Sequence, residues 1–157
     1  MIKNRNTLVL MLVAAAICCL AVIAPPIAAQ NPQTAAISAN KLTVQKYMDG
    51  FTKSDHAAIL ACLTDDVEWF IPGAFRVVGK AEFDKQIENE GFVGSPTIKV
   101  TRMTEEHNVV VAEGSVRSAR KDGGVLSAVF CDVFEMQGGK IKRLTSYLME
   151  TKEETPK

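Results

Sequence analysis

Residues 109–149 read VVVAEGSVRSARKDGGVLSAVFCDVFEMQGGKIKRLTSYLM. Apolar and polar side chains alternate along most of this stretch, and a period of two is typical of a half-buried β-strand. Gly123-Gly124 and Gly138-Gly139 interrupt the alternation and are typical of hairpin turns. Short turns between consecutive strands produce an antiparallel meander. With one more strand upstream, the expected strands cover residues 97–104, 109–119, 125–136 and 140–149.

Helical spacing appears nearer the N-terminus. Val44, Tyr47, Met48 and Phe51 would share one face of a helix whose N-cap is Ser38. The other expected elements are a second helix from residue 54 or 55 to 64–66, β segments at 67–71 and 75–78, and a third helix from 79 to 91.

Helices therefore come mostly first and strands last, which favours an α+β fold over a doubly wound sheet. The meander needs a cover for its apolar face, and the three N-terminal helices supply one. We predict a cone-shaped domain over residues 38–151, in which these helices pack on a curved, mainly antiparallel sheet and enclose a pocket.

Composition excludes several classes of protein. The 157 residues contain 18 Lys and Arg against 18 Asp and Glu, and no basic stripe is present that would bind nucleic acid. Only two histidines and no CxxC motif occur, so no metal site is expected. The paired glycines do not precede a helix in a βαβ unit, so no nucleotide cofactor is expected.

The N-terminus has the order of regions of a secretory signal peptide. Lys3 and Arg5 precede an apolar run over residues 8–24, and small residues follow up to Ala29. We predict a signal peptide over 1–29, a short tether over 30–37 and a polar tail over 152–157. The mature chain would be periplasmic or secreted, with no membrane contact after cleavage. The alternative is an uncleaved membrane anchor.

Two cysteines, Cys62 and Cys131, would remain after cleavage. In an oxidising compartment they could form a disulfide. Alternatively, both are buried apolar thiols among hydrophobic neighbours. A domain of this size does not require the bridge.

Asp132 is the first candidate for chemistry. Its neighbours on both sides, from Phe130 to Phe134, are apolar, and burial among them would raise the pKa of its carboxyl group. A neutral carboxylic acid can donate a hydrogen bond to a developing oxyanion, and an ionised one can act as a base. The alternative is a structural aspartate whose hydrogen bonds hold the sheet together.

Four apolar side chains are candidates for ligand binding. Trp69 and Ile71 share one face of their strand and would form a wall for a flat or cyclic ligand, or else pack in the core. Phe130 and Phe134 flank Asp132 and would suit an apolar ligand. Tyr47, on the first helix, could donate to Asp132 or to a ligand oxygen, or be an ordinary core tyrosine.

Four motifs in order resemble the nuclear transport factor 2-like superfamily, and within it the SnoaL-like branch. They are LTDDVEW at 63–69 with Pro72-Gly73, GKAEF at 79–83, CDVFEM at 131–136 and GKIKRLTSY at 139–147. The resemblance implies the cone fold and a homodimer formed through the convex face of the sheet. Because the superfamily includes isomerases, cyclases, dehydratases, epoxide hydrolases and domains without chemistry, it does not define one activity.

A comparison with ketosteroid isomerases, which share this fold, implies roles for individual residues. Tyr47 resembles the tyrosine of the oxyanion hole, and Asp132 resembles the protonated aspartic acid beside it. Ile71 stands at the position of the catalytic base and cannot accept a proton, so steroid isomerisation is not expected.

Three functions remain open. The first is an exported domain that binds a small apolar molecule in its cone cavity without a cofactor. The second is a cofactor-free isomerase, cyclase or lyase that acts on a small carbonyl compound, with Asp132 as the acid or base and Tyr47 as its helper. The third is an interaction module of the cell envelope.

Overall fold

The computed structural model describes residues 37–88 and 90–151. The predicted signal peptide at 1–29, the tether at 30–37 except its last residue, and the polar tail at 152–157 lie outside the described residues. No described helix is both long enough and apolar enough to cross a membrane.

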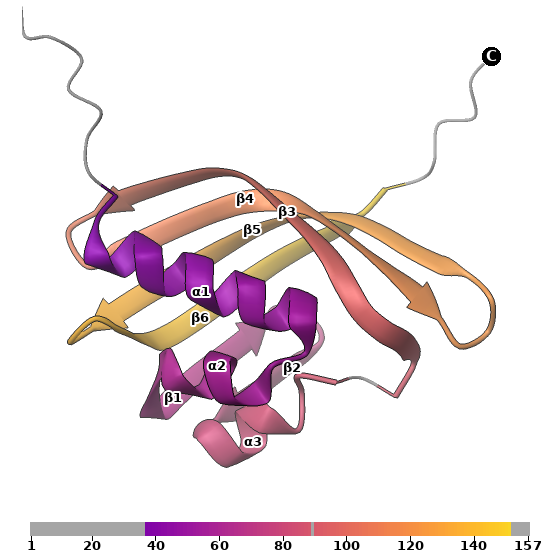
Figure 1. Cartoon of the computed structure of the whole chain (residues 1–157), viewed down its shortest axis with the longest axis horizontal. Helices are drawn as coiled ribbons and strands as arrows, with labels where there is room; N and C mark the ends of the chain where they lie inside the picture. The colour runs from indigo at the N-terminus through magenta and orange to yellow at the C-terminus, as the bar shows by residue number, and fades with distance from the viewer. Residues whose placement is uncertain (1–36, 89, 152–157) are drawn as a thin grey trace, which may run out of the picture. The chain divides into compact units, whose positions relative to one another are not determined.

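The elements follow one another in the order expected of an α+β fold (Figure 1). They are α1 (Ala39–Lys53), α2 (His56–Ala61), β1 (Leu63–Ile71), β2 (Phe75–Val78), α3 (Lys80–Asp84), β3 (Phe92–Glu106), β4 (Val109–Arg120), β5 (Val125–Gln137) and β6 (Lys140–Glu150). The strands form one six-stranded sheet in the order β2-β1-β6-β5-β4-β3. The predicted fold class is confirmed.

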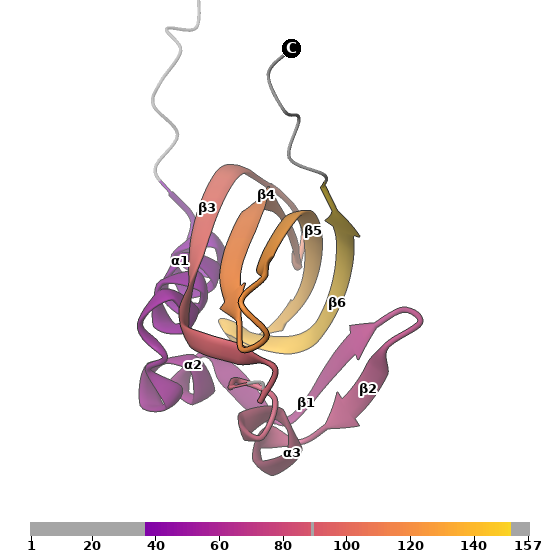
Figure 2. The ribbon, with the colours of Figure 1, turned by 90° about the vertical axis from the view of Figure 1, so that its right-hand side faces the viewer.

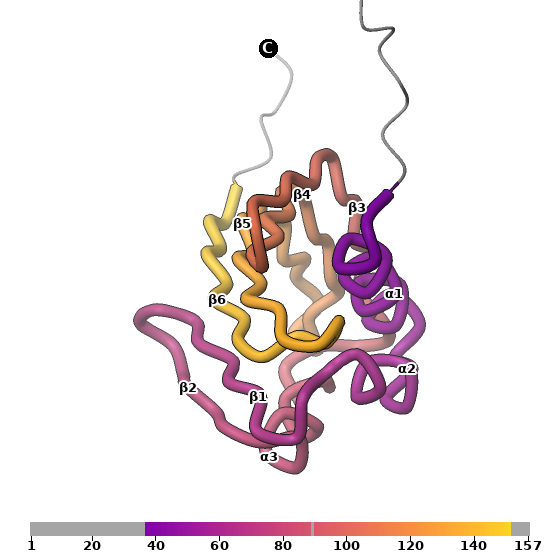
Figure 3. The backbone as a smooth tube through the Cα atoms, turned by 90° about the vertical axis from the view of Figure 1, so that its left-hand side faces the viewer, coloured from indigo at the N-terminus to yellow at the C-terminus, as the bar shows by residue number. Residues whose placement is uncertain are grey.

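The sheet is antiparallel except at one place. Strands β3 to β6 form the expected meander, β1 lies parallel to β6, and β2 pairs antiparallel with β1 at the edge. Figure 2 shows that β3 to β6 curve into an arc. Helix α1 packs beside β3, and the hairpin of β1 and β2 lies on the opposite side of the domain (Figure 3).

Two expected helices are shorter in the structure. Helix α2 ends at Ala61 because the next residues already pair with β6: the Ile141 amide donates to the Cys62 carbonyl at 2.8 Å, and Leu63 lies opposite Ile141. Helix α3 ends at Asp84 instead of residue 91. After it, the Gln86 and Ile87 amides donate three residues back, which is the hydrogen bonding of tight turns.

Helix α1 forms where its cap and its apolar face were expected. The Ser38 side chain accepts a hydrogen bond from the Lys41 amide at 3.1 Å, which satisfies one free donor of the first turn. Val44, Tyr47 and Met48 are buried against the sheet. The apolar face of α1 therefore covers the concave side of the arc.

Three rows of cross-strand neighbours follow one another along the concave face. The first lies at the fully buried, closed end of the cone and the last at its open end. Val110, Phe134 and Leu144 form a row in which no side chain is more than 1% exposed. The next row is Ala112, Asp132 and Ser146, and the third is Gly114, Phe130 and Leu148, of which Leu148 is 46% exposed. Asp132 thus lies where the packed core ends.

Gly114 allows the Phe130 ring to lie against the sheet. A Cβ at this position would come within 2.6 Å of Phe130 Cζ and 2.2 Å of the Lys99 carbonyl oxygen. Because the second of these atoms belongs to the backbone, strand β3 would have to move. We expect Gly114→Ala to lower the free energy of unfolding by about 1–3 kcal/mol, measured by urea denaturation. Unchanged stability would mean that β3 shifts freely.

Candidate ligand pocket and buried carboxyl group

A cavity of about 190 Å³ lies between α1 and the concave face of the sheet. Its walls come from α1 and from every strand except β2. The lining residues are Tyr47, Met48, Phe51, Trp69, Ile71, Pro96, Ile98, Val116, Phe130, Asp132, Ser146 and Leu148. Nearly all of these side chains are apolar, so the few polar groups determine what the cavity can do.

Asp132 is the one carboxyl group in this lining, and it is 9% exposed. Burial raises its pKa from the ordinary value to about 7, and a hydrogen bond from Ser146 offsets part of this effect. Its Oδ1 atom is buried and has no hydrogen-bond partner among the described residues. The group can therefore donate when protonated and accept when ionised, and it changes between these states near neutral pH.

Ser146 connects Asp132 to the aromatic wall. The Trp69 Nε1–H group donates to Ser146 Oγ at 3.1 Å, and Ser146 lies opposite Asp132 in the sheet. The Trp69 ring stacks on Phe83 at a centroid distance of 4.8 Å. Phe83 and Ser146 together hold the indole in place. The serine hydroxyl accepts from the indole N–H group, so its own hydrogen remains available to the Asp132 carboxyl group.

Tyr47 faces the same cavity from α1 and is 2% exposed. Burial raises the pKa of its hydroxyl well above the ordinary value, and the nearby Asp132 carboxylate adds to this. The hydroxyl therefore stays protonated at physiological pH and can act only as a neutral hydrogen-bonding group.

The structure brings most of the predicted site residues together. Tyr47, Trp69, Ile71, Phe130 and Asp132 all line the cavity. Phe134 does not. It is fully buried toward the closed end of the cone, where its ring meets Tyr47 edge-on at 5.5 Å.

Sequence reasoning assigned no role to several residues of the lining. Ser146 is the most important of these, because it is the hydrogen-bond partner of both Trp69 and Asp132. Its place on the concave face could be read from the alternation with Leu144 and Leu148, but its register opposite Asp132 could not. Met48 and Phe51 were placed on the inner face of α1 without a role in the pocket.

The cavity opens beside a wider groove of about 690 Å³, which shares Pro96, Val116 and Leu148 with it. A third hollow, of about 660 Å³, lies at the hairpin between β3 and β4 and has no buried titratable group in its lining. The smaller cavity is therefore the candidate site, and the groove lies beside it.

Neither free cysteine belongs to the site. Cys62 is buried in the core and Cys131 is partly exposed on the other face of β5. Among residues 37–88 and 90–151, no group of three or more His, Cys, Asp or Glu side chains could hold a metal ion.

The model of the SnoaL-like domain family matches residues 44–144. This range includes most of α1, the meander up to the middle of β6, and every residue of the cavity lining except Ser146 and Leu148. The chain belongs to the SnoaL-like domain family. The match to this SnoaL-like model confirms the resemblance found in the sequence motifs. No curated protein matches the chain.

Solved structures share the SnoaL-like fold at low sequence identity. An LEH-like epoxide hydrolase of M. tuberculosis has a TM-score of 0.63 and 20% identity, covering 71% of this chain and 83% of that one. A candidate polyketide cyclase from Xanthomonas campestris has a TM-score of 0.64 and 23% identity, covering 69% and 89%. A candidate ketosteroid isomerase from Kribbella flavida has a TM-score of 0.58 and 22% identity, covering 76% and 84%. These similarities show the fold alone.

The chain contains a single tryptophan, Trp69, so intrinsic fluorescence reports on the pocket. We expect the emission of the wild-type protein to titrate with a midpoint near pH 7, because Asp132 ionises beside the serine that holds the indole. The titration should be absent in Asp132→Asn. In Ser146→Ala its midpoint should rise, since the hydrogen bond that lowers the pKa is lost. A pH-independent wild-type emission would contradict this coupling.

Proposed function

We propose that this protein is an exported SnoaL-like domain that binds a small apolar molecule in its cone cavity. The observation that carries the proposal is the cavity lining, in which apolar side chains surround one buried carboxyl group. An apolar cavity with few, convergent polar groups is the usual form of a small-molecule site.

The experiment uses a matched pair of valine substitutions, one inside the cavity and one outside it. Val116 lines the cavity, whereas Val78 lies on the edge strand β2, outside the cavity lining, and is 56% exposed. We expect small cyclic hydrocarbons and ketones to change the Trp69 emission and raise the melting temperature of the wild type and of Val78→Phe. Val116→Phe, which fills the cavity, should abolish both effects. Equal binding to the two variants would refute the pocket.

A second candidate function is a cofactor-free isomerase, cyclase or lyase that acts on a small carbonyl compound. It is favoured by the pKa of about 7 for Asp132, because a general acid or base works best near the operating pH. Tyr47 would hydrogen-bond the carbonyl oxygen from the same cavity. Ile71, at the position that resembles the catalytic base of ketosteroid isomerases, cannot accept a proton. Asp132 would therefore have to remove the proton from the substrate itself.

Proton removal next to a carbonyl group can be tested without knowing the substrate. Cyclohexanone in D₂O exchanges its α-protons, and NMR follows the loss of their signal. We expect acceleration by the wild type and none by Asp132→Asn if this second function is correct. If cyclohexanone binds but its proton exchange is not accelerated, the catalytic function is refuted and only the binding function remains.

We also propose a homodimer formed through the convex face. Val129, Tyr147 and Met149 are neighbours there on β5 and β6 and are 41%, 53% and 67% exposed. Exposed apolar patches on a sheet often mark an interaction surface. Sedimentation should show a dimer for the wild type and a monomer for the double variant Tyr147→Asp, Met149→Asp.

Export is tested on the full-length chain. Expressed in a bacterial host, it should appear in the periplasm or medium with a new N-terminus near residue 30. Retention in the membrane fraction at full length would instead indicate the uncleaved anchor.

A further inference from the structure

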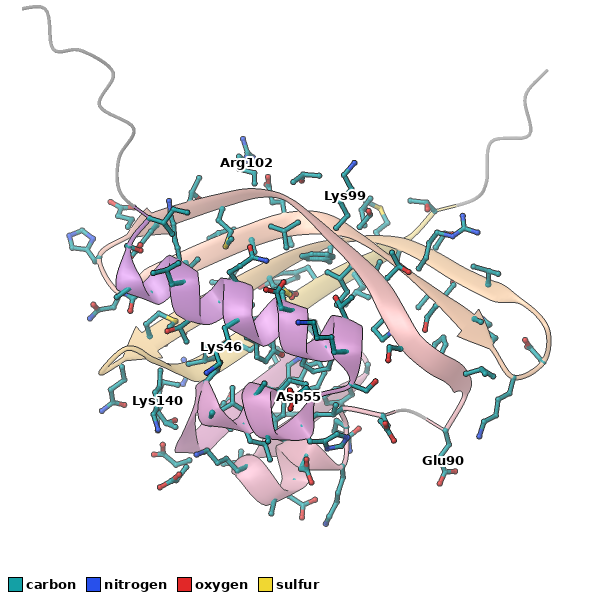
Figure 4. All side chains as sticks on the ribbon, viewed as in Figure 1. Lys46, Asp55, Glu90, Lys99, Arg102 and Lys140 are labelled. Atoms are coloured by element: carbon teal, nitrogen blue, oxygen red, sulfur yellow. The ribbon has the colours of Figure 1, made fainter. Side chains whose placement is uncertain are left out.

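Among residues 37–88 and 90–151, no Lys, Arg or His residue lines the cavity that contains the buried Asp132 carboxyl group. The charged side chains labelled in Figure 4 are exposed and lie around the outside of the domain; they are Lys46, Asp55, Glu90, Lys99, Arg102 and Lys140. A buried carboxylate is ordinarily paired with a cation, so this one lacks the usual compensation.

The hydrogen-bond donors around Asp132 leave one of its two carboxyl oxygens without a hydrogen bond. Tyr47 faces it from α1, Ser146 from β6 and Trp69 from β1, while its neighbour on β4 is Ala112. The Trp69 N–H group is already bound to Ser146. Oδ1 of Asp132 still has no partner among the described residues, although it is buried. The pocket therefore has an open position for a hydrogen-bond donor.

The rest of the lining suits the positive end of a molecule. Tyr47, Phe51, Trp69 and Phe130 contribute aromatic rings, and Met48 contributes a polarisable thioether. Aromatic π systems attract cations, and more strongly in a site shielded from water. A neutral hydrocarbon would fill this space but would leave the carboxyl oxygen unpaired, which costs free energy.

We propose that the pocket binds a small apolar ammonium compound, a primary or secondary amine on one ring or short chain, whose N–H group donates to Asp132. This inference rests on the proposed ligand-binding function and names the class of ligand. The ammonium group supplies both the missing donor and the missing positive charge, and the ring occupies the apolar walls. A cavity of about 190 Å³ holds roughly six water molecules at liquid density, which suits a single six-membered ring.

The test compares cyclohexylamine with cyclohexanol, cyclohexanone and methylcyclohexane, which have nearly the same shape. Affinities are measured by calorimetry and by the change in Trp69 emission between pH 5.5 and 8.5. The amine stays protonated over this range, as a lysine side chain does. If only the ionised carboxyl group binds it, a midpoint of about 7 predicts roughly 30-fold tighter binding at pH 8.5 than at pH 5.5.

Two variants separate the carboxyl group from the general charge of the protein. Asp132→Asn keeps the shape of the side chain and should reduce the amine to the affinity of cyclohexanol at every pH. Glu113→Gln removes a carboxylate on the other face of the neighbouring strand, where it pairs with Arg102, and should leave amine binding unchanged.

Each outcome decides the proposal. It stands if cyclohexylamine binds most tightly at high pH and loses this advantage in Asp132→Asn. It is overturned, with the pocket function intact, if cyclohexanol, cyclohexanone or methylcyclohexane binds as tightly as the amine at pH 8.5. If none of the four compounds binds, both this inference and the pocket function fail.

Discussion

Replacement of Asp132 by asparagine is expected to stabilise the protein above neutral pH and to change little near pH 4. Burial raises the pKa of this carboxyl group to about 7, whereas the unfolded chain has the ordinary value of 3.8. Between these two values the folded state holds one proton more than the unfolded state, so wild-type stability falls as the pH rises. Above pH 7 both states are ionised and the loss is complete.

The size of this effect follows from the difference in the proton affinity of Asp132 between the folded and the unfolded chain. Each tenfold change corresponds to about 1.4 kcal/mol, so the difference between a pKa of 3.8 and one of about 7 makes the loss in the wild type on the order of 4 kcal/mol. Asparagine does not ionise and should avoid this loss. Urea denaturation at pH 4, 5.5, 7 and 8.5 measures it. Glu113→Gln, an exposed ion-paired position, should stay close to the wild type throughout. A difference between Asp132→Asn and wild type that does not vary with pH would show that the carboxyl group is not desolvated.

The stabilisation expected of Asp132→Asn is also relevant to function. A buried carboxyl group that lowers the stability of its own fold breaks the ordinary rule for core residues, and such exceptions are expected at functional sites. The position next to an open cavity, rather than inside the packed core, agrees with that interpretation. The stability experiment and the ligand experiment therefore examine the same desolvated group independently.

Phe134→Ala is expected to be the most destabilising single substitution on β5. The side chain is fully buried between Val110 and Leu144, and its ring meets Tyr47. Removing it leaves a hole that the surrounding strands cannot close, which lowers the free energy of unfolding by about 3–5 kcal/mol.

Phe70→Ala is the matched control, because the same atoms are removed from a ring that is 37% exposed on β1. Its loss should be about 1–2 kcal/mol, clearly smaller than that of Phe134→Ala. Both are measured by urea denaturation at pH 5.5. Equal losses in the two variants would mean that the closed end of the cone is less tightly packed than the structure indicates. Loss of Phe134 should also disturb ligand binding through Tyr47.

The sequence predicted most of the sheet because its signals are local. Alternation over residues 109–149 placed Val110, Ala112, Gly114 and Val116 on one face, and this is the concave face in the structure. Paired glycines placed the turns. The helix ends were less well predicted: residues 62–63 were expected near the end of a helix, but pairing with β6 makes Leu63 the start of a strand.

The candidate site depended more on tertiary structure. Alternation put Phe130, Asp132 and Phe134 on the same side of β5, but it could not tell which would line a cavity. The answer depends on where α1 and the neighbouring strands cover that side: Phe134 meets Tyr47 in the core, while Phe130 and Asp132 reach the opening.

By itself, then, the sequence determined the class of fold, the order of its elements and the face of the sheet to which each side chain belongs. These follow from the spacing of neighbouring residues along the chain. Only the tertiary structure decided that Ser146 and Trp69 meet beside Asp132, and that one carboxyl oxygen is left without a partner. Both depend on strand register and on the depth of burial, which are set by segments far apart in the chain.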